Sequence, residues 1–289
     1  MALLVGCGMS YEETKRLRQE QQKQALREDS AALKVAVMPT LDCLPLFVAE
    51  DREMFDTAVD IRLKEFTAQM DCDTALQRGR VEMAITDLVR AEMMKRDKNK
   101  KLEIGYLTAT NAYWLLIGNR NQRITQLKHL DDRMVAMTRY SVTDMLTSMA
   151  VDSAKLKSER VFRIQVNDVN VRLDMLENNE MDALLMKHHT LLDTRKLDMR
   201  MGAIVEDSVV MSLPDRQRQR EALVKGYNAA CDSLNHLGLK PYYDVIRRHY
   251  DVSEQALRRL PDSLKFMQVT APREKDIELA RQWAGRLKN

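Results

Sequence analysis

Apolar and polar residues alternate between residues 33 and 87 in a pattern that predicts strands separated by helices. Short apolar runs rich in β-branched residues indicate the strands, and apolar residues at helical spacing indicate the helices. Strands are expected at 33–38, 59–66 and 82–86, with helices ending near residues 54 and 78. This order favours right-handed crossovers and a parallel sheet, whose ligands bind beyond the carboxyl ends of the strands. The loops concerned are 39–44, 66–70 and 86–88.

The second half of the chain repeats the same order of elements. Further strands are expected at 103–108, 112–118, 134–137, 161–166 and 182–186, with helices at 141–151 and 170–177. Residues 76–85 resemble residues 176–185: each segment ends a helix, continues with a Gly or Asn suited to the left-handed conformation, and then begins a strand. Residues 199–211 are expected to return the chain in strands, and the remainder from Pro214 is expected to be helical.

These elements predict an α/β protein with two Rossmann-like lobes, each with a central mixed sheet, joined by a hinge that the chain crosses twice. The expected organisation is a lipoprotein N-terminus and tether at 1–32, the first part of lobe one at 33–109, lobe two at 110–200, and a return to lobe one at 201–289. The small polar residues at 108–111 suit the floor of the hinge.

Composition excludes several classes of protein. Charged residues make up 31% of the 289 residues, and no apolar run reaches the roughly 18 to 20 residues that span a bilayer. The 46 basic and 43 acidic residues are spread along the chain and form no basic stripe, so we expect no nucleic-acid partner. The 19 Met residues are explained by core filling or by a Met-rich binding surface.

The N-terminus has the form of a lipoprotein signal. Residues 3–7 (LLVGC) match the end of a bacterial lipobox, in which Cys7 would be acylated, although the basic region and most of the apolar region that precede it are missing. A chance Val-Gly-Cys is the alternative. Residues 10–30 are dense in charged and amide side chains and indicate a tether that lifts the domain off a membrane. A lipid-anchored periplasmic or cell-surface location follows from this interpretation.

The residues around Ser141 are the strongest candidate site on physical grounds. Ser141 and Asp144 have the spacing of a capping box at the start of a helix, whose free amides and dipole favour an anion. Arg139 would add a fork of donors, and Tyr140 could stack on an organic ligand. A plain helix cap beside a surface Arg is the alternative.

Metal and cofactor sites are not expected. The cysteines have no C-x-x-C spacing. Cys43 and Cys72 are expected near the strand-end loops of one lobe, where they could meet, but two ordinary buried thiols are the favoured interpretation. The adjacent pair His188-His189 cannot point at one ion, and no third ligand is placed beside it. With nine glycines and no glycine-rich phosphate loop, a bound cofactor is not expected.

Several motifs resemble the type II periplasmic-binding-protein fold. The opening strand and loop VAVMP at 35–39, the segment DCLPLFVA at 42–49 and the strand GRVEMAITD at 79–87 resemble the family's opening elements, with Glu82 where Asp is common. The helix around 225–228 and the terminal helix around Trp283 fit as well. The chain is most similar to solute-binding proteins of ABC transporters in the aliphatic-sulfonate, nitrate and thiamine-precursor group.

The resemblance implies a small-molecule ligand clamped between two lobes by hinge closure. It implies a monomer that captures a small organic, anionic solute and delivers it to an ABC permease, with the membrane contacted only through a lipid anchor. The ligand-binding residues that it implies are Thr40, Leu41, Asp42, Thr67, Thr86, Asp87, Thr110, Asn111, Arg139, Tyr140, Ser141, Asn167, Asp168, Lys187 and His188.

Two alternatives remain open at this point. An enzyme resembling the thiamine-pyrimidine synthases or menaquinone-pathway enzymes would need acids or bases in the cleft, and Asp42, Asp87, Asp168 and His188 are available. A sensory or orphan binding module without a transporter is the third interpretation.

Overall fold

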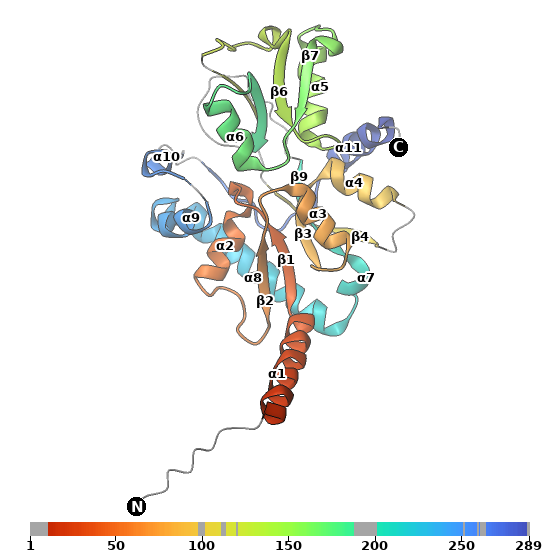
Figure 1. Cartoon of the computed structure of the whole chain (residues 1–289), viewed down its shortest axis with the longest axis vertical. Coiled ribbons are helices and arrows are strands. Elements are labelled where there is room, and N and C mark those ends of the chain that lie inside the picture. The colour runs from red at the N-terminus through yellow and green to blue at the C-terminus, as the bar shows by residue number, and fades with distance from the viewer. Residues whose placement is uncertain are drawn as a thin grey trace, which may run out of the picture.

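The protein has two lobes, each built on its own β-sheet (Figure 1). The computed structural model describes residues 11–97, 102–110, 114–119, 121–187, 201–250, 252–258, 260 and 264–287. We use the name lobe one for the part built on the five-stranded sheet and lobe two for the part built on the four-stranded sheet.

The sheet of lobe one has the strand order β2-β1-β3-β9-β4. Its strands are β1 (Leu33–Val37), β2 (Ile61–Glu65), β3 (Met83–Asp87), β4 (Ile104–Thr110) and β9 (Gly202–Asp207). β1 pairs in parallel with β2 and β3, whereas β9 is antiparallel to both β3 and β4. Every residue of β1 and β3 is buried, because helices cover both faces of a central parallel strand.

Most helices belong to lobe one or pack against it. They are α2 (Leu44–Asp51), α3 (Gln69–Gln77), α4 (Leu88–Arg96), α7 (Ser208–Met211), α8 (Pro214–Leu237), α9 (Tyr243–His249), α10 (Glu254–Arg258) and α11 (Glu274–Arg286). α8 packs on α2 and on the segment that follows α2, where a Cβ on Gly226 would lie 2.5 Å from Cδ1 of Phe55 and 3.0 Å from the carbonyl oxygen of Met54. Short 3₁₀ helices at Leu41–Cys43 and Lys240–Tyr242 precede α2 and α9.

The sheet of lobe two has the strand order β5-β8-β6-β7. Its strands are β5 (Trp114–Gly118), β6 (Arg133–Met137), β7 (Val161–Gln165) and β8 (Ala183–Lys187), and its helices are α5 (Val142–Ser153) and α6 (Val169–Glu177), with 3₁₀ helices at Leu127–Leu130 and Ser158–Arg160. β6 is parallel to β7 and β8, and β5 is antiparallel to β8. The chain therefore leaves lobe one between β4 and β5 and returns between β8 and β9.

The internal repeat predicted from the sequence is confirmed at its turns. Gly79 after α3 has φ of +63°, and Asn179 after α6 has φ of +62°. Both residues thus adopt the left-handed conformation that ends a helix before the next strand.

The expectation that residues 199–211 form returning strands is wrong in its second half. β9 ends at Asp207, whose carboxylate accepts hydrogen bonds from the amides of Val209 and Val210. This side-chain cap starts α7 directly after the strand, so the apolar residues 209–211 lie on a helical turn instead of in a second strand.

One large cluster of buried apolar residues runs through both lobes. It includes Phe47 and Val48 of α2, Ile85 of β3, and Val142 and Met145 of α5. A smaller cluster around Leu184 lies on the other face of the lobe-two sheet. The lobes therefore share packed apolar surface in this structure.

Helix α1 (Tyr11–Ala31) projects away from lobe one and has no buried residue (Figure 1). At 21 residues it is about 30 Å long. Among the described helices, none has a run of apolar residues that could cross a membrane.

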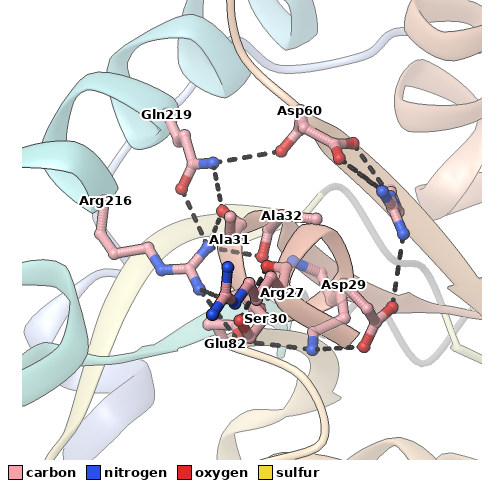
Figure 2. Close-up of polar contacts among 11 residues, drawn as sticks. Arg27, Asp29, Ser30, Ala31, Ala32, Asp60, Glu82, Arg216 and Gln219 are labelled. Atoms are coloured by element: carbon pink, nitrogen blue, oxygen red, sulfur yellow. Dashed lines mark hydrogen bonds and ion pairs between the residues drawn. The ribbon is translucent and has the colours of Figure 1, made fainter. Parts of the chain in front are cut away.

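The last turn of α1 is clamped to lobe one by two side chains of α8 (Figure 2). The guanidinium of Arg216 donates to the carbonyl oxygens of Ser30, Ala31 and Ala32 at 2.6, 2.9 and 2.5 Å. Gln219 donates to the carbonyl oxygen of Ala31 at 2.9 Å. These donors satisfy carbonyl groups that the end of a helix leaves unpaired, so α1 leaves lobe one in a defined direction.

Candidate functional site

A cavity of about 290 Å³ lies between the lobes. Three groups of residues line it. Lobe one contributes Met38, Pro39, Thr40 and Gln69. Lobe two contributes residues of β5, of α6 and of the loops that start α5 and α6, among them Trp114, Thr138, Ser141, Asn167 and Arg172. The segment around α9 and α10 contributes Ile246, Tyr250, Val252, Leu257 and Leu260. The cavity lies beyond the carboxyl ends of β1, β6 and β7, where solutes of parallel sheets bind.

Arg172 on α6 is a buried cation in the wall of this cavity. It is 3% exposed, and its guanidinium donates to the carbonyl oxygens of Val166 (2.6 and 3.1 Å) and Leu185 (2.6 Å) and to Oγ1 of Thr138 (2.7 Å). Burial lowers the pKa of Arg172 to about 10, and the charge of Asp168 opposes this shift. Within the described part of the chain, Arg172 makes no ion pair.

The sequence of α6 places Arg172 on its inner face. Asp168 caps the helix by accepting hydrogen bonds from the amides of Asn170 and Val171 at 2.8 and 3.0 Å. From this start, Arg172 and the apolar Leu176 follow one another on the buried side. An arginine on the buried face of a helix is uncommon unless its charge has a role.

The loop that starts α5 is held rigid by hydroxyl groups. The carbonyl oxygen of Thr138 accepts from Oγ of Ser141 (2.7 Å) and from Oγ1 of Thr143 (3.2 Å), while the amide of Thr138 donates to Oγ1 of Thr143 (2.9 Å). Tyr140 between them is in the left-handed region with φ of +58°. The hydroxyl of Thr138 is thereby fixed at the cavity wall.

Ser141 caps α5 as the sequence predicts, but Asp144 does not complete a capping box. Oγ of Ser141 accepts from the amide of Thr143, while Oδ2 of Asp144 accepts from the amide of Tyr140 at 3.1 Å, one residue before the cap. Oδ1 of Asp144 pairs with Arg163 at 3.1 Å. Arg139 is exposed and does not line the cavity.

The N-terminus of α5 faces a carboxylate of the other lobe. Asp87 at the end of β3 is fully buried, and burial raises its pKa, whereas the nearby backbone amide of Val142, the first residue of α5, favours the ionised form and opposes this shift. Asp87 accepts hydrogen bonds from Nε2 of Gln69 (2.5 Å) and from the amide of Arg90 (2.9 Å). We call this set of contacts between Asp87, Gln69 and Val142 the Asp87 latch.

The lobes also touch through backbone groups beside the cavity. The amide of Val169 donates to the carbonyl oxygen of Thr67 at 3.2 Å, and Ala68 and Asp168 form an isolated antiparallel bridge. Thr67 precedes α3 and Val169 begins α6, so these contacts join the two helices that flank the cavity.

The other candidate residues from the sequence lie around the cavity or beside it. Leu41 and Asp42 are buried in the turn after β1, and Oγ1 of Thr110 donates to Oδ2 of Asp42 at 3.3 Å. Thr86 is buried and accepts from Gln69 at 3.3 Å. Lys187 ends β8, but its side chain, Asn111, His188 and Cys7 lie outside the described residues. These roles in binding stay predictions.

Sequence reasoning missed several residues that line the cavity. Thr138, Gln69 and Arg172 were not singled out, and neither was the wall from α9 and α10, including Ile246 and Tyr250. A charged residue within the apolar period of α6 was a signal that could have pointed to Arg172. The α9–α10 wall had no such signal, because it comes from a segment far away in sequence.

The cavity combines a polar side with an apolar side. Hydroxyl and amide groups surround Arg172, whereas the α9–α10 wall is mostly apolar. Asp174 and Glu177, both exposed, add negative charge at its edge. Among the described residues, no group of His, Cys, Asp and Glu is arranged to hold a metal ion, and Cys43 and Cys72 are buried thiols.

No protein-family model matches the sequence, and no curated protein matches it. Solved structures do. The alkanesulfonate-binding protein SsuA from Xanthomonas axonopodis pv. citri, bound to MOPS, is 12% identical with a TM-score of 0.69, covering 88% of this chain and 91% of its own. The nitrate-binding protein NrtA from Synechocystis PCC 6803 is 13% identical with a TM-score of 0.65, and the match covers 82% of this chain and 73% of NrtA.

A third similar structure is a Candida albicans gene product described as having the generic periplasmic binding protein fold. It is 14% identical with a TM-score of 0.65, and the match covers 89% of this chain and 91% of the other. The chain has the periplasmic-binding-protein fold. The fold class expected from the sequence is thus confirmed, with two lobes, two mixed sheets and two crossings of the chain.

Proposed function

We propose that the protein is an extracytoplasmic solute-binding protein that captures a small organic anion between its lobes for an ABC importer. The observation that carries this proposal is Arg172, a buried cation in the wall of the cavity between the lobes. A buried charge is unfavourable unless an opposite charge or strong hydrogen bonds compensate it. An anionic solute would supply the charge that the neutral partners of Arg172 do not.

The ligands named for two similar structures support an anion. One structure is an alkanesulfonate-binding protein and another is a nitrate-binding protein, and both ligands carry negative charge. The apolar α9–α10 wall favours a solute with an apolar body over a bare inorganic ion.

The contacts of the cleft carboxylates favour capture over chemistry. Asp87 accepts hydrogen bonds from Gln69 and from the amide of Arg90, Asp168 caps α6, and Asp42 accepts from Thr110. A general acid or base needs a proton that it can exchange with a substrate. Carboxylates engaged in structural hydrogen bonds serve that purpose poorly, which supports a protein that is not an enzyme.

We further propose that Cys7 is acylated and that α1 separates lobe one from the membrane. The exposed, charge-balanced surface of α1 and its clamp to α8 suit a spacer between an anchor and a binding domain. The protein would act as a monomer beside its permease.

A thermal-shift screen of the full chain tests the binding proposal. Aliphatic sulfonates and carboxylates are compared with neutral analogues of the same chain length, together with nitrate, pyrimidines and amino acids. A ligand at a hundred times its Kd stabilises by about 2.7 kcal/mol, a rise in Tm of roughly 5 °C or more for a chain of this size. At least one organic anion should give such a rise; stabilisation by neutral or cationic compounds alone would contradict the proposal.

A further inference from the structure

We propose that the hydroxyl of Thr138 is the hydrogen-bond donor that receives the anionic end of the solute, and that the solute carries a single negative charge there. Arg172 is then a positioning residue that acts through Thr138. This inference rests on the proposed function and names the group and the ligand charge that the same cavity would select.

The first step is the hydrogen bond between the two residues. Nη2 of Arg172 donates to Oγ1 of Thr138 at 2.7 Å, so the hydroxyl accepts from a cation. The proton of that hydroxyl has no acceptor among the residues that the structure describes. Thr138 is 5% exposed and lines the cavity. A hydroxyl polarised by a guanidinium is a stronger donor than an ordinary one, and an anion is its best acceptor.

The second step is the direction of the guanidinium. The remaining contacts of Arg172 go to the carbonyl oxygens of Val166, directly after β7, and of Leu185, in the middle of β8. The fork is therefore engaged by the backbone, and its charge reaches the cavity mainly by way of Thr138. Two loop hydrogen bonds fix the position of Thr138 in turn: its carbonyl oxygen accepts from Oγ of Ser141, and its amide donates to Oγ1 of Thr143.

The third step is the count of charges around the cavity. Among the lining residues that the structure describes, Arg172 is the one with a basic side chain, whereas Asp174 and Glu177 are acidic. One buried positive charge compensates one negative charge. A second negative charge on the solute would meet acidic side chains at the edge, so a dianion such as a phosphate monoester should be rejected.

A bromide soak tests the donor without knowledge of the natural solute. Crystals of the full chain are soaked in sodium bromide, and the ion is located by its anomalous scattering. We expect a peak within hydrogen-bonding reach of Oγ1 of Thr138, its loss in Thr138→Val, and its return in Thr138→Ser. Bromide bound instead at Arg139, or a peak unchanged in Thr138→Val, would overturn the inference.

Thr147→Val is the matched control for that experiment. Thr147 lies on α5, is 1% exposed, and donates its hydroxyl to the carbonyl oxygen of Thr143 at 2.8 Å without lining the cavity. The same loss of a hydroxyl should leave the bromide peak in place. If both valine variants lose the peak, the effect comes from α5 as a whole and the role of Thr138 is refuted.

Thermal shifts with hexanesulfonate, hexyl phosphate and neutral hexanesulfonamide test the charge at pH 8. Hexanesulfonate should stabilise the protein and hexyl phosphate should not, and Thr138→Val should weaken hexanesulfonate about ten- to a hundred-fold. Arg172→Met should remove the preference for sulfonate over sulfonamide, an effect that a merely structural role would not produce. Preference for the phosphate ester would overturn the single-charge inference.

The two proposals fail in different ways. Bromide at Thr138 without stabilisation by any organic anion refutes organic solute capture and supports the donor role. Stabilisation by organic anions that persists undiminished in Thr138→Val supports capture and refutes the donor role.

Discussion

Two arginines show how far single residues could be interpreted from the sequence. Arg139 precedes a helix cap and is conspicuous in the sequence, yet it lies exposed outside the cavity lining. Arg172 lies among the apolar positions of α6 in the sequence, where it attracts no notice, and is buried beside the cavity. A sequence indicates which helix end can attract an anion, but the burial of one side chain depends on which face of the helix packs inward.

Asp87 makes stability depend on pH. Burial raises its folded-state pKa above the ordinary 3.8, so the folded protein holds the proton more tightly than the unfolded chain. Between 3.8 and the raised value, stability therefore falls as pH rises. We expect the unfolding free energy of the wild type, relative to that of Asp87→Asn, to decrease as the pH rises through that window.

Denaturant titrations of the two proteins over a series of pH values from acid to neutral measure this difference. Asp87→Asn removes the titrating group and keeps the shape of the side chain. A wild-type advantage that grows with increasing pH would show that the folded state favours the ionised carboxylate, which contradicts burial as the dominant effect.

At the scale of elements, strands and helices with a strong period were predictable, and contacts between distant elements were not. The left-handed turns at Gly79 and Asn179 follow from local chemistry and were expected. The cap by Asp207 is local as well. The prediction followed the apolar strand pattern of residues 209–211 and missed that the Asp207 side chain starts a helix there. The clamp on α1 depends on Arg216 and Gln219, about 185 residues later in the chain, and no local pattern indicates it.

The clamp predicts that one substitution on α8 loosens α1. Arg216→Met removes the donors to three carbonyl oxygens at the end of α1, and the loss of such hydrogen bonds costs about 1–3 kcal/mol locally. Hydrogen exchange of the amides near residues 28–34 should accelerate about five- to a hundred-fold. Arg218→Met, on the exposed side of the same helix, should leave exchange unchanged; equal acceleration in both variants would argue against the clamp.

At the scale of the whole molecule, the two-lobe architecture was predictable because each lobe follows its own strand and helix order. The angle between the lobes could not be predicted, because it depends on contacts between distant residues, such as the Asp87 latch and the bridge between Ala68 and Asp168. At the N-terminus of α5, which the sequence offers as an anion site, the amide of Val142 faces Asp87 of the protein itself.

The latch predicts the separation of the lobes in solution. Asp87→Asn places an amide NH₂ group among the donors Gln69, Arg90 and Val142, which should weaken the contact with α5. Small-angle X-ray scattering should then give a larger radius of gyration than that of the wild type.

Asp73→Asn is the control for that measurement. Asp73 is also fully buried, but it pairs with Arg90 of lobe one at 2.7 Å. The radius of gyration of the Asp73→Asn variant should equal that of the wild type. An opening caused by Asp73→Asn and not by Asp87→Asn would place the control of lobe separation outside the latch.

The central claim is that the cleft binds an organic anion by means of the charge of Arg172. Calorimetric titration of hexanesulfonate into the wild type, Arg172→Met and Arg139→Met tests it most directly. We predict binding to the wild type, the same affinity in Arg139→Met, and an affinity about ten- to a hundred-fold lower in Arg172→Met. Equal affinities in the wild type and Arg172→Met, or a loss confined to Arg139→Met, would contradict the account.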